Sequence, residues 1–294
     1  MARRRFADEP TSRLAIWARR CAFFALMATV LSILIVRSGI LELVPALATF
    51  AGALVFAVVG IVLAFGAFIV IWKDGSNGMG HAFAAIAIGL ALIAYPAYLG
   101  YRATKLPMIN DITTDALDPP RFDVVARLRP RGTVEYAGLY AAELQREAYP
   151  DIEPLSVNAA PKAAYDAAMA VILRRKWRVV ADRPPLPPRR DGVIEAVART
   201  AIMGFRDDVA VRVRREDEGS RIDVRSASRY GRHDFGTNAA RIKALLDDID
   251  DRISTVAEEK AEKPVPKPAK QTKQPPSKGN QPAPPKRERE RPTG

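Results

Sequence analysis

LVPALATFAGALVFAVVGIVLAFGAFIVIW, the stretch Leu43–Trp72, has 30 residues and no charged side chain. About 20 apolar residues carry a helix across the roughly 30 Å hydrocarbon core of a bilayer. This stretch therefore predicts a tilted membrane-spanning helix, with its core at Leu47–Ile71. Its glycines are compatible with that assignment, because membrane helices pack closely through small residues. The sequence thus predicts an integral membrane protein.

Two further apolar runs flank this stretch, at 17–36 and 80–101. The charge-free part of the first run is short for a bilayer, and Arg19 and Arg20 extend it by reaching to the interface. A cleaved signal peptide is the alternative for this run, but no small-residue cleavage site follows it and further apolar runs do. The second run ends in a cluster of tyrosines, which is typical of a membrane interface. The segment 17–101 therefore predicts three spans.

The charges around the spans predict their orientation. The N-terminal segment 1–16 is rich in arginine, whereas the loops after the spans hold few cations. The positive-inside rule places this basic N-terminus in the cytoplasm, and three crossings place the C-terminal domain on the far side. We expect a multi-pass protein of the cell inner membrane with a periplasmic domain. Since no span carries an ionisable side chain at mid-depth, an anchor is favoured over a transport path.

Beyond the spans the sequence changes to a soluble pattern. Residues 102–130 predict an extended connector, because Pro119 and Pro120 disfavour helix. Residues 131–254 combine helical spacing of apolar residues with alternating segments, and alternation indicates strands with one wet face. The expected elements are helices at 137–147, 161–176 and 235–253 and strands at 177–181, 193–200, 208–214 and 221–228.

The predicted fold class is an α-helical three-span membrane region followed by an α+β soluble domain. In that domain a four-stranded antiparallel sheet carries helices on one face. Residues 258–294 are rich in lysine, proline and glutamate. We expect this tail to be disordered, because such a composition cannot bury a core.

Composition also bounds the function. The formal net charge is +12, and the excess of cations lies mainly at the two ends of the chain. That distribution suits topology control or contact with anionic surfaces, so no nucleic-acid partner is expected. With one cysteine and two histidines in the chain, no metal and no cofactor are expected either.

Two runs of the soluble region resemble a known family. They are FRDDVAVRV at Phe205–Val213 and VRSASRYGRHDFGTNAARI at Val224–Ile242. The similarity covers about 110–250, and the connector motifs NDITTD and PPRF are also similar to members with N-terminal membrane helices. The family is catalogued as domain of unknown function 1499 and is found in bacteria and plastids. The resemblance implies a membrane-associated protein of unestablished function and brings no catalytic residue with it.

The second run is also the best candidate for a site. It predicts a strand end, a glycine turn and a helix N-terminus. The N–H groups of a helix N-terminus favour anions, and nearby arginines add bidentate contacts to phosphate or carboxylate. The hypothesis is an anion-binding site for a lipid headgroup or an acidic glycan. Its candidate residues are Arg225, Ser226, Ser228, Arg229, Arg232, Asp234, Asn238 and Arg241.

A purely structural interpretation of these residues is stronger. Arg225 and Arg229 share one strand face and can pair with Asp223 and Glu195 as a charge lattice. Asp234 can serve only as a helix cap, and the serines can point into the core. The site hypothesis therefore needs the geometry of the side chains to support it.

Two classes of function follow. The first is a membrane-anchored module that binds an envelope component, such as an anionic lipid, a glycan or an envelope protein. The alternative is a membrane-anchored enzyme acting on a lipid or cell-wall substrate. The enzyme is less favoured, because the chain has no GxSxG elbow and Ser228 and His233 are too close in sequence to predict a triad.

Overall fold

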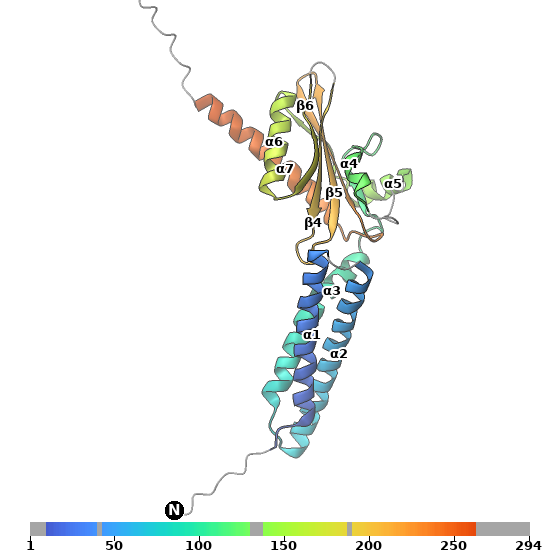
Figure 1. Cartoon of the computed structure of the whole chain (residues 1–294), viewed down its shortest axis with the longest axis vertical. Coiled ribbons are helices and arrows are strands. Elements are labelled where there is room, and N and C mark those ends of the chain that lie inside the picture. Colours follow the sequence, from blue (N-terminus) through green and yellow to red (C-terminus); the bar gives the residue numbers. More distant parts are fainter. Residues whose placement is uncertain (1–9, 40–42, 130–137, 187–189, 263–294) are drawn as a thin grey trace, which may run out of the picture.

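The structure is a computed structural model that describes residues 10–39, 43–129, 138–186 and 190–262. Three long helices form a bundle, and a sheet domain sits on one end of that bundle (Figure 1). The start of the first helix lies at the opposite end of the bundle. The molecule therefore consists of a helical bundle and a sheet domain carried at its tip.

The bundle contains α1, Arg13–Ser38, α2, Leu43–Asp74, and α3, Met79–Ala103. All three helices are long and apolar enough to cross a membrane, in agreement with the three predicted spans. Each helix runs past the bounds expected from the sequence and includes terminal cations such as Arg37 and Lys73. Charge ends the apolar run, but it does not end the helix, because such side chains can reach the interface.

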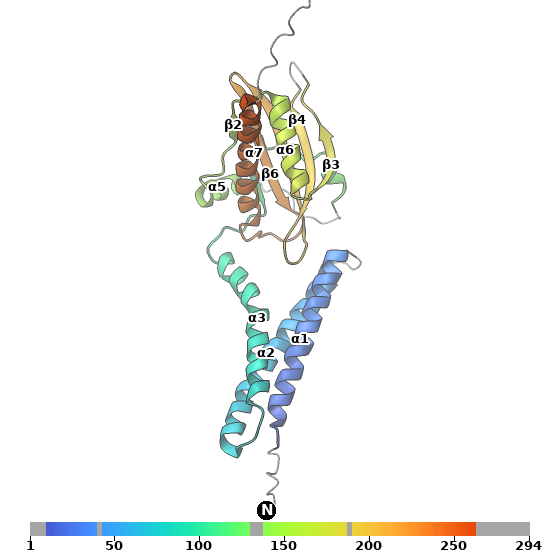
Figure 2. The same ribbon diagram turned by 90° about the vertical axis from the view of Figure 1, so that its left-hand side faces the viewer.

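The central helix of the bundle is α2, and small residues let its neighbours approach closely. A Cβ added at Gly60 would lie 3.2 Å from the carbonyl oxygen of Ala18 in α1. A Cβ added at Gly89 in α3 would lie 3.2 Å from the carbonyl oxygen of Ala57. The buried residues of α3 all lie in its first half, and α1 and α3 diverge toward the sheet domain (Figure 2). The bundle is thus most tightly packed at the end far from the domain.

The sheet has six strands, whereas the sequence predicts four. They are β1, Asp111–Thr113, β2, Leu155–Val157, β3, Arg178–Arg183, β4, Gly192–Arg199, β5, Arg206–Glu216, and β6, Gly219–Ser228. The order is β1-β6-β5-β4-β3, with β2 also paired to β6, and all pairings are antiparallel. The four predicted strands are β3 to β6. The other two have only three residues each, which is too short for an alternating pattern to reveal them.

Two helices cover one face of the sheet and build the main core (Figure 1). They are α6, Pro161–Arg174, and α7, Thr237–Glu262. Val209, Val211 and Val213 of β5 are fully buried in this core. Their spacing of two places all three on the same face, as the alternation in the sequence predicts.

The opposite face of the sheet is covered as well, so the expectation of a wet face with helices on one side only is wrong. The chain from β1 to residue 129 crosses this face and contains α4, Val124–Arg127. The helix α5, Gly138–Ala148, lies on the same side of the sheet (Figure 1). Glu195 of β4 is fully buried there. Its carboxylate accepts three backbone N–H groups at the start of α4, at 3.1, 3.0 and 2.8 Å. Charged residues of this face therefore have partners in the connector.

The last helix differs from its prediction at both ends. It begins at Thr237, because Phe235 and Gly236 have positive φ angles of 54° and 75° and cannot be helical. Asp234 caps it as expected, accepting the N–H of Asn238 at 2.8 Å. The helix continues to Glu262, so 258–262 are helical and not disordered. The rest of the predicted tail, 263–294, lies outside the described residues.

The bundle and the domain meet at two contacts. At the end of α1, Arg37 Nη1 donates to the carbonyl oxygens of Ala201 and Ile202 at 2.7 and 3.1 Å. Gly204 has a φ of 73°, and a Cβ added there would lie 2.8 Å from Arg37 Cγ. At the end of α3, Gly236 packs against the Arg102 side chain. The β4–β5 loop therefore rests on α1, and the β6–α7 loop rests on α3.

Candidate functional site

The eight candidate residues lie on β6, on the β6–α7 loop and on the first turns of α7, but they do not face one space. Ser226, Ser228, Asn238 and Arg241 lie between β6 and α7, whereas Arg225 and Arg229 lie on the face that the connector covers. Asp234 is the cap of α7, and Arg232 is exposed in the loop. The sheet thus separates residues that are neighbours in sequence.

On the α7 side, Asn238 holds the strand end to the helix. Its Oδ1 accepts the Ser226 hydroxyl at 2.8 Å, and its Nδ2 donates to the Ser228 hydroxyl at 3.0 Å. Arg241 forms an ion pair with Asp207, whose side chain is only 2% exposed. Burial raises the pKa of Asp207, although the Arg241 guanidinium acts to lower it. These side chains satisfy one another, which is the behaviour of a structural network.

On the connector side, each arginine has a carboxylate. Arg225 makes a bidentate contact with Asp111, at 3.0 Å from Nε and 2.8 Å from Nη2. Arg229 holds the fully buried Asp208 at 2.9 and 2.8 Å, and Arg129 holds the other oxygen of that carboxylate at 2.7 Å. Burial raises the pKa of Asp111, and the Arg225 guanidinium acts to lower it. The interpretation as ion pairs is correct, but the partners are not Asp223 and Glu195.

A second group of charges continues along the same face. Asp223 is fully buried and lies within 3.1 Å of Arg212, Arg214 and Arg221. Asp115 lies 3.0 Å from the guanidiniums of two of these, Arg214 and Arg221. The sequence signal of this lattice is the alternation of arginine and aspartate along β6, from Arg221 to Arg225, opposite the arginines of β5. The acidic residues of the connector that complete it were missed, because nothing in the sequence places the connector on this face.

This arrangement leaves little room for an external anion at most of the predicted site. A guanidinium that is already bidentate to a buried carboxylate has no fork free for phosphate. Arg232 is the exception among the eight, since it is exposed and forms no salt bridge with any residue that the structure describes. Anion binding by the run as a whole stays a prediction.

Ser228 and His233 do not form a catalytic pair in this arrangement. The Ser228 hydroxyl accepts a hydrogen bond from Asn238 at 3.0 Å. His233 Nδ1 accepts the backbone N–H of Phe235 at 2.9 Å, and the two rings stack at 4.7 Å. Because Nδ1 is an acceptor, the histidine serves the turn before α7.

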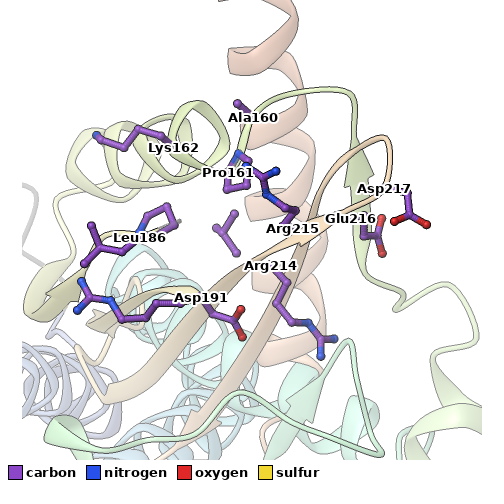
Figure 3. Close-up of a pocket in the computed structure, with 12 residues that line it drawn as sticks. Ala160, Pro161, Lys162, Leu186, Asp191, Arg214, Arg215, Glu216 and Asp217 are labelled. Carbon is purple, nitrogen blue, oxygen red and sulfur yellow. The ribbon is translucent and has the colours of Figure 1, made fainter. Parts of the chain in front are cut away.

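A cavity of about 670 Å³ lies at the other end of the domain (Figure 3). It is bounded by the start of α6, the β3–β4 loop and the far end of β5, and we call it the distal pocket. Leu186 and Pro161 contribute apolar surface, and Arg215 and Asp191 contribute opposite charges. Figure 3 shows Arg215 extending toward Pro161. No sequence motif predicts this pocket, because its three walls are far apart in the chain.

Comparison with known proteins bears on the sheet domain alone. Residues 111–249 match the model of a family described as "Protein of unknown function (DUF1499)". The match begins at β1 and ends within α7, so it omits the helical bundle. A search of curated proteins found no match. The resemblance noted in the sequence is therefore confirmed over the range expected for it.

Proposed function

Because residues 111–249 form a domain of the DUF1499 family, whose function is unknown, we propose a function from the arrangement of this chain. The protein is a membrane-anchored binding module that presents the distal pocket to the compartment beyond the membrane. The observation that carries this proposal is the position of the pocket. Its lining includes the last residues of β5, and Figure 1 shows that the opposite end of this strand faces the bundle.

The chemistry of the distal pocket favours a peptide segment as its ligand. Its apolar wall, formed by the accessible side chains of Pro161 and Leu186, suits an aliphatic side chain. Arg215 and Asp191 lie at its edge, and neither forms a salt bridge with a residue that the structure describes. A chain that carries both signs of charge next to apolar groups complements such a pocket. Peptides of an envelope protein or of an envelope polymer have that chemistry.

The location of this ligand follows from the predicted topology. The basic segment 1–16 favours a cytoplasmic N-terminus, and three crossings then direct the sheet domain outward. We therefore propose that the distal pocket opens into the periplasm of a cell with two membranes. A partner on that side could be reached without any movement of the bundle.

Site-specific crosslinking in the native membrane tests this function. A photo-crosslinking amino acid is placed at Leu186 in the pocket, and in a second variant at Leu173, which is similarly exposed but lies outside it. We expect a defined peptide-containing product from position 186 only. The product should be lost when Arg215→Glu is added, because that change reverses the charge at the edge.

The contrary results are clear. If position 186 gives no product, or gives the same products as position 173, the pocket has no specific occupant and the function fails. If the product persists with Arg215→Glu, the proposal that the charge of Arg215 contributes to ligand binding is refuted. Thermal unfolding of each variant checks that the sheet domain is intact.

A further inference from the structure

The end of the domain that faces the bundle carries a group of cations. They come from the two helix ends and from the loops that rest on them. We call this group the basal rim, and it consists of Arg37, Arg102, Lys105, Arg199, Arg206 and Arg232. Arg37 and Arg199 are placed by hydrogen bonds across the α1 contact. A Cβ added at Gly39 would lie 3.1 Å from Arg206 Nη2, which places Arg206 at the same contact.

The basal rim is not neutralised by the domain. Among the residues that the structure describes, none of its six cations forms a salt bridge. The described carboxylates at the base of the domain are already used, because Asp207 pairs with Arg241, Asp208 pairs with Arg229, and Asp234 caps α7. The buried network thus removes the anions that could have balanced the rim.

Apolar side chains accompany these cations at the same level. The tip of the β4–β5 loop is the apolar run Ala201–Phe205, in which Ile202 is 40% exposed. At the end of α3, Tyr98 and Tyr101 are exposed and lie under the cations of Arg102 and Lys105. Exposed aromatic and aliphatic groups beside cations are typical of contact with the interface of an anionic bilayer.

The helices below provide room for acyl chains. No residue of α3 after Gly89 is buried, and this half of the helix diverges from α1 (Figure 2). An apolar helix surface without a protein partner is covered by lipid in a membrane. Arg102 lies in the last turn of α3 and Lys105 follows the helix, so a lipid lying along this half would place its headgroup at the basal rim.

We infer that the basal rim binds an anionic phospholipid of the leaflet on which the domain rests. The acyl chains lie along the second half of α3, and the phosphate lies between Arg206 and Arg232. These two arginines are exposed, and like Lys105 they form no side-chain hydrogen bond to a described residue. This inference does not depend on the proposed function, because the distal pocket is at the opposite end of the domain.

Native mass spectrometry of the full chain in detergent tests the inference. Phosphatidylglycerol and phosphatidylcholine are titrated separately, and the lipid-bound fraction is measured. We expect the wild type to prefer phosphatidylglycerol at least tenfold. The double variant Arg206→Gln, Arg232→Gln should lose about 25-fold in affinity for that lipid, since each cation near an anionic surface contributes about fivefold. Its affinity for phosphatidylcholine should not change.

A matched control removes the same number of charges elsewhere. The variant Arg190→Gln, Arg215→Gln lowers the net charge equally at the distal pocket, and it should bind phosphatidylglycerol within twofold of the wild type. The double variant Arg206→Lys, Arg232→Lys should retain most of the affinity for phosphatidylglycerol. The inference is overturned if the glutamine variant binds like the wild type, or if the control falls as far.

Inorganic phosphate distinguishes a lipid from a soluble anion. Millimolar phosphate should not displace phosphatidylglycerol, because it offers no acyl chain to the surface of α3. Displacement would identify a site for a free anion and would refute the lipid assignment. Crosslinking from position 186 should be unaffected by the changes at 206 and 232, so the two proposals can fail separately.

Discussion

Replacing Asp208 with asparagine should destabilise the sheet domain far more than the same change at an exposed aspartate. Asp208 is fully buried and is held by Arg229, which is 3% exposed, and by Arg129, which is 14% exposed. Asparagine has nearly the same shape, so the change removes charge and leaves packing intact. Breaking a buried pair on one side costs about 3–5 kcal/mol, because the remaining charge is uncompensated.

The presence of two arginines places the expected cost near about 4 kcal/mol. That corresponds to a factor of about a thousand in the unfolding equilibrium and to a fall of about 12 °C in Tm for a domain of this size. Hydrogen exchange of the full chain in lipid nanodiscs measures it, through the protection of amides in β5 and β6. Protection should fall by about three orders of magnitude.

Asp118→Asn provides the matched control. Its carboxylate also contacts two arginines, Arg212 at 2.9 Å and Arg214 at 3.4 Å, but its side chain is 60% exposed. An exposed pair contributes less than about 1 kcal/mol, so protection should fall less than about fivefold. If the two variants lose the same small amount, the arginines at Asp208 are not held by it. The anion-binding hypothesis for Arg229 would then regain its support.

Three further predictions concern pH, the contact with α1 and the topology. Burial tends to raise the pKa of Asp115, but the N–H of Asp118 and the Arg214 guanidinium outweigh it and lower that pKa below 3.8. This carboxylate therefore stabilises the domain above pH 3.8, and the stabilisation is lost as the pH falls through the folded pKa. Asp115→Asn should consequently flatten the fall in Tm measured between about pH 4 and 2. Gly204→Ala should increase hydrogen exchange at amides 200–205 more than Gly231→Ala increases exchange in its own loop. Both glycines have a positive φ, but only Gly204 faces a close contact, with Arg37. Equal effects of the two substitutions would show that backbone strain alone matters. Alkaline phosphatase fused after Gly294 should be active if that end is periplasmic, and an inactive fusion of normal abundance would reverse the predicted topology.

The sequence predicts the parts of this fold that repeat a local pattern. Leu43–Trp72 has the length and composition of a spanning helix, and β5 has valine at every second position from Val209 to Val213. The cap at Asp234 is also local, since its partners are two and four residues away. Such patterns can be recognised in the sequence because they depend only on residues that are close together in the chain.

The parts that could not be predicted depend on contacts between distant residues. Asp111 and Arg225 are 114 positions apart, and the alternation of arginine and aspartate is the same for an exposed lattice and a buried one. The lattice is buried because the connector covers it, and the prolines of the connector indicate only that the connector is extended. The distal pocket has the same origin, because Pro161, Leu186 and Val213 meet only when the sheet has formed.

The length of β5 sets the height of the distal pocket above the helical bundle. The strand begins at Arg206, beside the end of α1, and ends at Glu216 on the wall of the distal pocket. Ten residue steps of about 3.4 Å give a height of at most roughly 34 Å. Since the domain contacts the ends of both α1 and α3, its tilt relative to the bundle is restricted. The ligand that we propose for the distal pocket therefore lies at about this distance from the helix ends, where a lipid headgroup at the basal rim does not reach.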